Sequence, residues 1–515
     1  MRIPRFFSLL FLTALASTAA FSQIPYPNPI KHVVIIYQEN RTVDNLFGSN
    51  NPLNKYSLPG LVVSTSGQAY TIVNGKKNVF TVKSVPIPLA SAIGSTGSIE
   101  ADDYDPDHSH LPAFVNACDA PAITDPTTAC LMDGFNHVGI VCQPGATGCP
   151  GPKYPTYAYV RYKDVVPYFQ IASQYGYANY MFQTNAGPSY PAHQFIFGGT
   201  SQSGVSPEPT WFLAENLSPQ TNNNGCFSPA NVTVGELDPA NQTEVKVYPC
   251  STHRTMVDLF TEHTPPISWT YYTPGEGGIW TAPNGISTLC TNGGTHCEGQ
   301  YWGPCAPTQT GCIDLAPADI LTDVGNCNLR QVSWVIPDAL ESDHGGSTDG
   351  SGPSWVASII NKIGSSPCTD VVHGKPRTYW EDTVILVTWD DWGGWYDHVV
   401  PPALSAKAPA VASSYLYGFR VPLMVVSAYT PAGTVDNTMG LDFGAMLKFV
   451  EEVFGGLGTI SDDPFNPFAD FFAKDDLHGF FQFTKPPRLF EPIDAPIKED
   501  VFLDPKRPHD GPDND

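Results

Sequence analysis

The chain has 515 residues, of which 26 are lysine or arginine and 50 are aspartate or glutamate, so its formal net charge at pH 7 is −24. This negative charge repels a polyanion at long range, and we therefore expect no nucleic-acid partner. A small phosphate-bearing substrate remains compatible, because a local metal ion can reverse the field at one point. Neither a repeat nor a long linker divides the chain, and we expect one large, elaborated domain.

The first residues have the pattern of a secretory signal peptide. Arg2 and Arg5 precede the apolar run FFSLLFLTALAS, and small residues follow it, so cleavage is expected near Ala20 or Ser22. This run is too short for a comfortable membrane span, and no later stretch approaches the roughly 18 apolar residues of a spanning helix. We predict a signal peptide over residues 1–22 and a secreted or periplasmic protein without a transmembrane segment.

Short apolar runs rich in β-branched residues indicate strands of a parallel sheet that is covered on both faces. These runs are Val33–Ile36, Val332–Ile336, Val384–Val387 and Val421–Ser427. In the last run, Pro422 suits the start of a strand.

Apolar residues at helical spacing predict two helices among these strands. In SGPSWVASIINKIG, Ser351 is a candidate cap, Pro353 suits the first turn and Gly364 the stop. In DFGAMLKFVEEVFGG, one apolar face begins at Phe443 and ends before Gly455. The alternation of strands and helices predicts an α/β layered fold.

Residues 200–330 are rich in Pro, Gly, Asn and Cys, and we predict an irregular, disulfide-tied insertion within a catalytic domain over residues 23–484. The 12 cysteines form no CxxC pair, which favours disulfides over a zinc ribbon or a thioredoxin motif. Three pairs share one spacing and could each close a local loop, although the sequence leaves connectivity open: Cys142 with Cys149, Cys290 with Cys297, and Cys305 with Cys312. The Pro- and Asp-rich residues 485–515 are predicted to wrap the surface or to be partly disordered.

Polar pairs follow two of the predicted strands. VVIIYQ runs into Glu39-Asn40, and VILVTW runs into Asp390-Asp391. Because parallel α/β sheets carry their chemistry at the carboxyl ends of strands, the two pairs could meet there as hard oxygen ligands of a divalent cation. Either pair could instead begin a solvated loop, but their occurrence after two similar strands favours a site.

A candidate nucleophile lies in NAGPSYPAHQFIFGGTS. Gly187 and Pro188 before Ser189, with Pro191 after it, would hold the hydroxyl on a rigid turn aimed at a fixed electrophile. A serine in such a turn is often ordinary. The chain has no GxSxG motif, so a lipase-type serine hydrolase loses its main signature.

Three acidic, turn-rich contexts among the 13 histidines add candidates. DYDPDHSH contains His108 and His110, ESDHGG contains His344, and WYDHV contains His398 beside Asp397. Such imidazoles could contact phosphoryl oxygens or protonate a leaving group.

Aromatic residues offer a candidate site for a substrate cation. The stretch WTYY, Trp269 to Tyr272, together with Trp392 and Trp395, could surround a choline-like group, or these residues could belong to the core.

These motifs together resemble the bacterial phosphoesterase family that contains phospholipases C and acid phosphatases. QENRTVDNLFG is similar to the family signature ENRxFDxxFG, and further motifs follow in the family's order: DPDHSH, DGFNH, GPSYPAHQ, VSWVIPD, SDH, GPSWVASIINKIG, DTVILVTWDDWGGWYDHVVPP and FRVPLMVVS. The resemblance covers about residues 31–458, and so many ordered motifs are far more specific than any one. It implies an alkaline-phosphatase-like α/β/α sandwich with a mostly parallel central sheet and a one-metal site.

The resemblance also implies roles for single residues. Glu39 and Asn40 match the first pair of metal ligands, Asp390 and Asp391 match the second, and Ser189 matches the nucleophile. Many phospholipases have Glu in place of the second aspartate, so this pair resembles that of the acid phosphatase branch. The implied cofactor is one divalent metal ion. The oxygen ligands favour Ca²⁺, Mg²⁺ or Mn²⁺ and are compatible with Zn²⁺ or Fe.

Other positions match the family in part. His108 and His344 match its phosphate-contacting histidines, and we also consider His398 as a substrate-binding residue. Val43 replaces the usual Phe of the signature, a packing change that should leave the ligands unaffected. A further histidine of the acid phosphatase branch falls in the variable insertion, where His253 and His263 are both candidates.

The implied mechanism is two in-line displacements. Ser189 attacks phosphorus, the alcohol leaves with a proton from a histidine, and water hydrolyses the phosphoserine. The expected substrate is a small phosphate ester or a phospholipid, which would make the protein an acid phosphatase or a phospholipase C. The main alternative is a secreted binding or surface protein with a degenerate site, and a sulfatase is disfavoured because CxPxR is absent.

Overall fold

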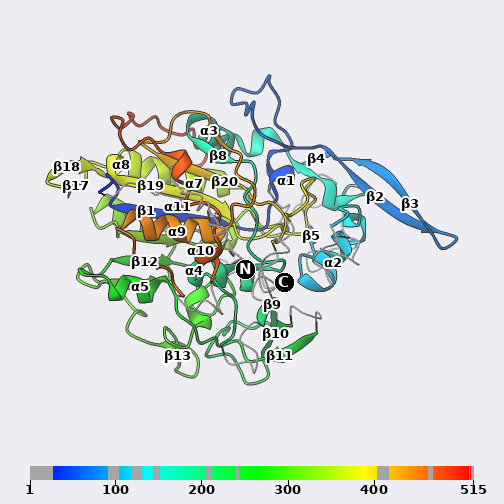
Figure 1. Cartoon of the computed structure of the whole chain (residues 1–515), viewed down its shortest axis with the longest axis horizontal. Coiled ribbons are helices and arrows are strands. Elements are labelled where there is room, and N and C mark those ends of the chain that lie inside the picture. Colours follow the sequence, from blue (N-terminus) through cyan, green and yellow to red (C-terminus); the bar gives the residue numbers. More distant parts are fainter. Residues whose placement is uncertain are drawn as a thin grey trace, which may run out of the picture.

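A computed structural model describes residues 27–90, 104–118, 130–142, 151–204, 211–238, 243–402, 417–461, 468–509 and 511. The predicted signal peptide and Cys149 lie outside these residues. An eight-stranded sheet forms the centre of the molecule, with helices on both faces (Figure 1). Its strands, from one edge to the other, are β15 (Gly311–Asp314), β12 (Trp269–Tyr272), β16 (Val332–Val335), β1 (His32–Gln38), β19 (Thr383–Trp389), β20 (Leu423–Ser427), β8 (Gly176–Ala178) and β21 (Thr434–Asp436).

The predicted α/β fold with a mostly parallel sheet is confirmed. β1 pairs in parallel with both β16 and β19, and all three strands are buried along their whole length, as continuous apolar runs require. β20 differs from the expectation of a parallel strand, because it runs antiparallel to β19 and to β8. Burial on both faces produces the same apolar run in either direction, so the sequence pattern does not report strand direction.

Helices pack on both faces of this sheet. Tyr37 of β1 contacts His193 of α4 and Phe443 of α9, whereas the next residue, Gln38, donates a hydrogen bond to Tyr168 of α3 on the opposite face. Period-two alternation along the strand therefore assigns these helices to two layers. The longer helices are α3 (Val166–Gln174), α4 (Ser189–Gly198), α5 (Met256–Glu262), α6 (Asp319–Gly325), α7 (Gly352–Gly364) and α9 (Phe443–Val453), and the short ones are α1 (Val43–Phe47), α2 (Val115–Ala117), α8 (Tyr379–Asp382), α10 (Ala469–Phe472) and α11 (Glu499–Phe502).

Both helices that the apolar spacing predicts are present as α7 and α9. Ser351 precedes α7, but its side chain makes no capping bond, whereas Asp442 caps α9 by accepting a hydrogen bond from the backbone N–H of Ala445.

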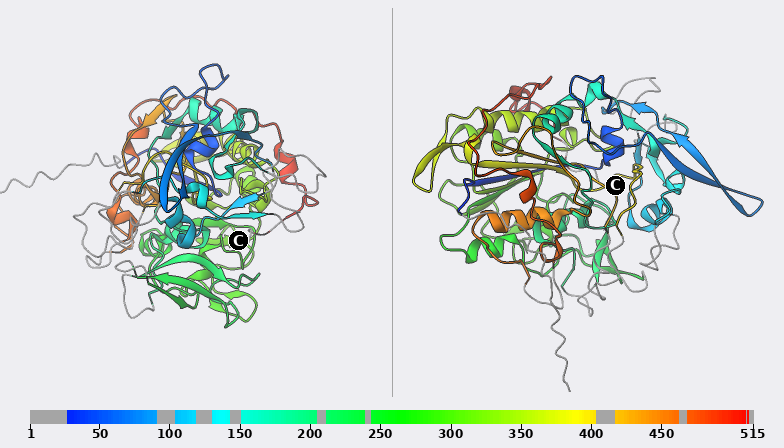
Figure 2. Two further views of the ribbon diagram at one scale, coloured as in Figure 1. Left: turned by 90° about the vertical axis from the view of Figure 1, so that its right-hand side faces the viewer. Right: turned by 45° about the horizontal axis from the view of Figure 1, so that its top comes forward.

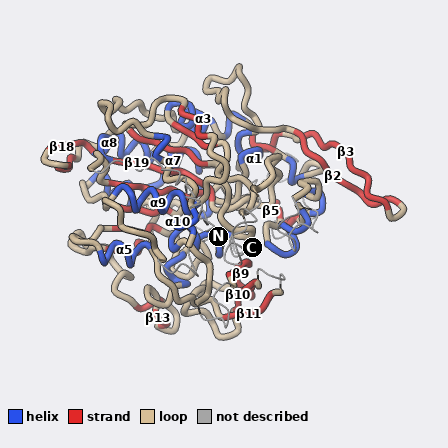
Figure 3. Tube along the Cα trace, in the orientation of Figure 1, coloured by secondary structure: helices blue, strands red, loops and turns tan. Residues whose placement is uncertain are grey.

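The region predicted as an irregular insertion contributes more to the fold than its composition indicated. β12 and β15 lie in it and form one edge of the central sheet. Around them, loops dominate (Figure 3), with a small antiparallel sheet of β9 (Phe212–Ser218), β10 (Thr233–Leu237) and β11 (Glu244–Val247). β12 and β15 both have four residues, which is too short to show periodicity. The sequence of β15, GCID, also contains a cysteine and ends in an aspartate.

Disulfides stabilise this region, as predicted. Cys290 is bonded to Cys297 and Cys305 to Cys312, which confirms two of the three local pairs. The partner proposed for Cys142 lies outside the described residues. Three further bonds join residues more distant in sequence: Cys118–Cys130, Cys226–Cys250 and Cys327–Cys368.

Two peripheral elements complete the molecule. The hairpin of β2 (Ser66–Val73) and β3 (Lys76–Lys83) projects from the body (Figures 1 and 2). The carboxyl-terminal segment wraps the surface, where Phe502 packs on Trp355 and Arg507 pairs with Glu341.

None of the described helices has the length and hydropathy that a membrane crossing requires. The smaller strands are β4 (Pro86–Ile87), β5 (Tyr104–Pro106), β6 (Ile140–Cys142), β7 (Tyr159–Val160), β13 (Thr291–Asn292), β14 (Cys297–Glu298), β17 (Thr369–Val372) and β18 (Lys375–Thr378).

Candidate active site

The two polar strand-end pairs meet at one edge of the sheet. β1 and β19 are parallel neighbours in a register that pairs Gln38 with Trp389, so the residues that follow them emerge side by side. The backbone N–H of Asn40 donates to Asp390 Oδ1 at 3.0 Å. Glu39, Asn40, Asp390 and Asp391 are all fully buried, which excludes the alternative of two solvated loops.

Ser189 reaches the same cluster from α4. It is the first residue of that helix, and its Oγ lies 3.1 Å from Asp391 Oδ2 and 3.4 Å from Asn40 Oδ1. Ser189 as a whole is 1% exposed, so the surrounding oxygens rather than bulk water determine the direction of its hydroxyl. The structure therefore brings together the predicted nucleophile and the four predicted ligands.

The approach of the two strand ends depends on backbone conformation. Asn40 adopts a left-handed conformation with φ +59°, which Asn tolerates better than most residues. Opposite it, Gly393 has φ +56°, and a Cβ there would lie 2.3 Å from the Asn40 carbonyl oxygen. Only glycine therefore fits the loop after Asp391 without displacing Asn40.

His193 of α4 also belongs to the cluster. It lies one helical turn after Ser189 on α4, and its Nε2 is 2.9 Å from Glu39 Oε1 and 3.7 Å from Asp390 Oδ2. One ligand atom from each of Glu39, His193 and Asp390 lies within 4.8 Å of the other two, so a single cation could contact all three.

The donor set fits a divalent cation. Glu39 Oε2 and Asp390 Oδ2 are buried and accept no hydrogen bond from the described residues, and no described lysine or arginine pairs with them. Buried carboxylates without a counter-charge are costly, so these oxygens require either protons or a metal ion. Accordingly, burial and then the Asp390 carboxylate raise the pKa of Glu39 well above its ordinary value, and the same two causes raise the pKa of Asp391.

Two histidines flank Asn40 on the side away from the carboxylates. His108 Nδ1–H donates to the Pro106 carbonyl oxygen at 3.0 Å, and His344 Nδ1–H donates to the Gly345 carbonyl oxygen at 2.8 Å. These bonds hold each ring by its Nδ1–H and direct Nε2 toward Asn40. The sequence-predicted histidines thus lie beside the predicted ligands.

The Asn40 amide connects these histidines to the acids. With Nδ2 toward the imidazoles, it lies 3.3 Å from His108 Nε2, and Oδ1 then faces the carboxylates. In the reversed orientation, the nitrogen would donate to Asp391 at 3.1 Å and to Asp390 at 3.2 Å, while the oxygen would accept from Nε2 of His344 at 2.6 Å. That orientation requires both imidazoles to be doubly protonated. With Oδ1 toward the acids, the amide oxygen would be available to a cation held by the carboxylates.

Comparison with known proteins agrees with this geometry. A model of the Phosphoesterase family matches residues 30–457. The chain belongs to this family. It is therefore a hydrolase of the phosphoesterase type.

Relatives of this phosphoesterase include phospholipases C. Phospholipase C A of Mycobacterium tuberculosis (strain ATCC 25618 / H37Rv) is 23% identical over 446 residues, which cover 83% of this chain and 73% of that protein. Non-hemolytic phospholipase C of Pseudomonas aeruginosa is 22% identical over 460 residues, covering 83% of this chain and 54% of that protein. Among solved structures, a protein in the alkaline phosphatase superfamily from Vibrio parahaemolyticus aligns with 62% of this chain and 64% of that chain, at 13% identity and a TM-score of 0.29, too low to carry an argument.

Other histidines considered from the sequence have different surroundings in this phosphoesterase. His398 hydrogen-bonds through Nδ1 to Asp44 at 2.7 Å, and although burial opposes it, that bond raises the pKa of His398. His253 packs beside Gly198, at the opposite end of α4 from Ser189, and His263 is near the surface with its Nδ1 at the Pro265 carbonyl oxygen. Because α4 has ten residues, about 14 Å separates its ends, so we do not assign His253 to the site.

The aromatic candidates for a choline site belong to the core of the phosphoesterase. Trp269 and Tyr272 are buried in β12, and Trp392 and Trp395 are fully buried in aromatic clusters. The alternative that these rings are core residues is therefore correct.

His193 is the functional candidate that sequence reasoning did not single out. Its sequence signal was the spacing of four residues from Ser189, which places both side chains on one face of a helix. Burial lowers the pKa of His193 to about 4, although the Asp390 carboxylate opposes this effect. The neutral ring can donate to Glu39 and orient it, or contribute a nitrogen ligand.

Proposed function

We propose that this phosphoesterase is a metal-dependent hydrolase of phosphate esters, of the acid phosphatase or phospholipase C type, with Ser189 as its nucleophile. The observation that carries this proposal is the position of the Ser189 hydroxyl, 3.1 Å from Asp391 in a buried cluster of acidic and amide oxygens. A degenerate binding protein would not need all of these groups intact and convergent.

Glu39, Asn40, Asp390 and Asp391 would hold the ion, with His193 as an orienting residue or an additional ligand. When bound, a divalent ion supplies charge stabilisation for the phosphoryl oxygens and lowers the pKa of a hydroxyl beside it. The hydrogen bond to Asp391 aims the Ser189 hydroxyl, and burial excludes competing water from it. Because Ser189 begins α4, the amino-terminal end of the helix dipole also favours the anionic phosphate.

His108 and His344 are proposed to act on the substrate. Both present Nε2 to the Asn40 side of the cluster, with the ring held by a backbone carbonyl at Nδ1. Protonated, either Nε2–H can donate to a phosphoryl oxygen or to the oxygen of the leaving alcohol. The reaction then proceeds in two in-line displacements: Ser189 Oγ bonds to phosphorus as the P–O bond to the alcohol breaks, and water later cleaves the phosphoserine.

The names of the relatives support a phospholipid as one substrate class, and the aspartate pair supports a small phosphomonoester as the other. Assaying one preparation against phosphatidylcholine and p-nitrophenyl phosphate separates the two. The disulfides support a location outside the cytoplasm. We further propose residues 1–22 as a signal peptide, residues 23–484 as the catalytic domain and residues 485–515 as a surface-wrapping tail.

The decisive experiment concerns Ser189→Ala. We expect this variant to lose nearly all turnover while retaining its fold and most of its metal, because one hydroxyl is removed from a fixed helix terminus. Acid quench of the wild type with a radiolabelled ester, followed by peptide mapping, should place the label on Ser189. Inversion at a chiral phosphorus without trapped label would instead indicate direct attack by water.

A further inference from the structure

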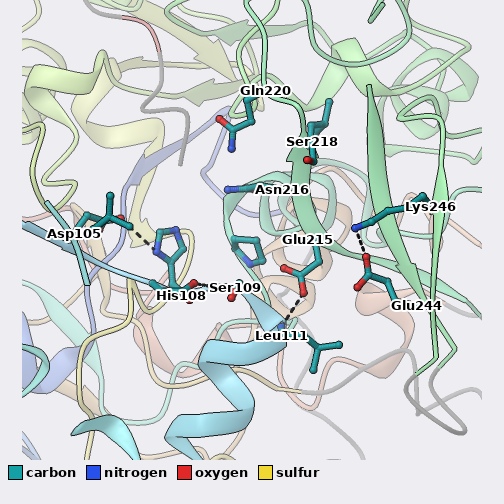
Figure 4. Close-up of a pocket in the computed structure, with 14 residues that line it drawn as sticks. Asp105, His108, Ser109, Leu111, Glu215, Asn216, Ser218, Gln220, Glu244 and Lys246 are labelled. Atoms are coloured by element: carbon teal, nitrogen blue, oxygen red, sulfur yellow. Dashed lines mark hydrogen bonds and ion pairs between the residues drawn. The ribbon is translucent and has the colours of Figure 1, made fainter. Parts of the chain in front are cut away.

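A cavity of about 540 Å³ lies next to the candidate site. Figure 4 shows the residues that line it. One wall is the segment around His108, and the other is formed by β9 and β11. Pro188, which directly precedes Ser189, also lines it. A substituent on a phosphate ester held at Ser189 would therefore enter this cavity.

The walls of the cavity are polar and carry a surplus of acid. Four carboxylates line it, from Asp105, Asp107, Glu215 and Glu244. Lys246 is the one lysine or arginine among the described lining residues, and it is paired with Glu244. Asp105 lies 3.9 Å from Nδ1 of His108. The four carboxylates still outnumber the Lys246 and His108 side chains, so the cavity has a net negative potential, which attracts a cation and repels a second anionic group.

Glu215 is held firmly at the wall. Its Oε1 accepts a hydrogen bond from the backbone N–H of Leu111 at 2.8 Å (Figure 4). Its Oε2 accepts one from the backbone N–H of His110 at 3.2 Å. Each carboxylate oxygen has a second lone-pair direction, so the side chain can accept from a ligand without losing these bonds.

The lining chemistry also distinguishes two kinds of substrate cation. A trimethylammonium group has no N–H and is recognised through the faces of aromatic rings. None of the described lining residues is Trp, Tyr or Phe, and the aromatic residues that could have served are in the core. A primary ammonium group donates up to three hydrogen bonds, which carboxylates and amide oxygens accept strongly.

From these observations, and resting on the proposed function, we infer that the cavity selects phosphate esters that carry a primary ammonium group over those that carry a trimethylammonium group, with Glu215 as the specificity-determining residue. The retained substituent of the ester occupies the cavity, while the leaving alcohol departs from the opposite side of phosphorus. An aminoethyl phosphate group has the right charge and enough hydrogen-bond donors for this role.

The test compares, above pH 8 where Glu215 is ionised, three p-nitrophenyl phosphodiesters whose second substituent is 2-aminoethyl, 2-(trimethylammonio)ethyl or ethyl. We expect kcat/KM to be at least about tenfold higher for the aminoethyl ester than for the trimethylammonioethyl ester, the value of one charge-assisted hydrogen bond. Equal rates, or a preference for the trimethylammonioethyl ester, would overturn the inference.

Glu215→Gln, assayed above pH 8 where Glu215 is ionised, tests the assigned residue, since it keeps the shape and removes the charge. The ratio of kcat/KM for the aminoethyl ester to that for the ethyl ester should fall about tenfold. Glu262→Gln is the matched control, because Glu262 is an exposed partner of Arg254 and does not line the cavity; its ratio should be that of the wild type. An unchanged ratio in Glu215→Gln contradicts the assignment. If that variant does not fold, Glu215→Asp, which keeps the charge but withdraws it by one methylene, should lower the same ratio, and an unchanged ratio again contradicts the assignment.

A binding measurement separates this inference from the proposed function. Calorimetric titration of Ser189→Ala with the aminoethyl ester should show about tenfold tighter binding than titration with the trimethylammonioethyl ester. If this difference is present while Ser189→Ala still turns over, the covalent mechanism fails and the cavity assignment stands. If Ser189→Ala is inactive and binds both esters equally, the cavity assignment fails alone.

Discussion

The two ends of the central sheet both gather histidine and carboxylates, but with opposite electrostatics. At the amino end, Asp370 pairs with Lys31 and with His32, which begins β1. Although burial opposes it, hydrogen bonds from His32 and Lys31 lower the pKa of Asp370 to about 2. At the carboxyl end, burial and neighbouring acid raise the pKa values of Glu39 and Asp391.

The two ends differ in whether a lysine or arginine of the chain neutralises the carboxylates. A third group, Asp44 with Asp397 and His398, resembles the amino end, because Arg420 pairs with both of its carboxylates. Of the three groups, which all have ligand-like spacing, only the one with Glu39 and Asp390 has neither a lysine nor an arginine among its described partners. Spacing alone therefore does not distinguish these groups, whereas uncompensated buried charge selects one of them as the candidate metal site.

The largest expected effect comes from changing the carboxyl end. Asp390→Asn should lower kcat/KM on the order of 10³-fold and reduce bound metal, since it removes an anionic ligand. In the presence of a chelator, however, the variant should melt at a higher temperature than the wild type, because like-charge repulsion is relieved. Metal analysis and thermal melts with and without chelator test both. Full activity in metal-free wild-type protein would contradict the site.

His193→Ala should have a smaller effect, about 10- to 100-fold in metal affinity, because an orienting partner or one ligand is lost while the carboxylates remain. His193→Gln retains a donor toward Glu39 and should recover part of this affinity if orientation is the main role. Competition with a chromophoric chelator measures both variants. Equal loss in the two would indicate that His193 is itself a ligand.

Glu215 extends the comparison to a carboxylate beside the site. Burial, assisted by Glu244 and opposed by the N–H groups of Leu111 and His110 and by Lys246, raises the pKa of Glu215 to about 8. The free enzyme therefore carries a neutral Glu215 below pH 8 and an ionised one above it. KM for the aminoethyl ester should fall several-fold as pH rises from 6 through 8 and level off above about pH 9. The ratio of its KM to that of the ethyl ester cancels effects of pH on the other groups, and a flat ratio would refute the prediction.

The smallest effect should come from the amino end. Asp370→Asn is expected to lower the free energy of unfolding by about 1 kcal/mol at pH 6, a value discounted for solvent screening, and to leave bound metal unchanged. Because the folded pKa is depressed, the stabilisation is present above pH 4 and is lost as pH falls toward 2. Urea unfolding at pH 6 and pH 3 should show a smaller difference from wild type at the lower pH. Loss of metal on this substitution would mean that the amino end also binds an ion.

Much of the site could be predicted because its residues follow strong local signals. Asp390-Asp391 and Glu39-Asn40 each follow a continuous apolar strand, and Ser189 lies between prolines. His193 was missed because a single histidine in an apolar helix is more often a core residue than a ligand. Its contact with Glu39 is visible only when the helix is packed against β1. β12 and β15 were read as part of an insertion because strands of four residues leave no periodic pattern.

The sequence by itself predicted the fold class, since continuous apolar strands and helical spacing are each expressed within a single element. It also supplied the candidate ligand pairs and the candidate nucleophile, since these stand in recognisable local motifs. Only the tertiary structure decided which group of acids lacks a counter-charge, because Lys31 and Asp370, or Asp44 and Arg420, are hundreds of residues apart and their pairing is visible only in the folded chain. The tertiary structure also decided the direction of β20, the assignment of the tryptophans to the core and the acidic wall of the cavity. The reason is the same, because strand pairing, burial and charge balance depend on contacts between distant segments.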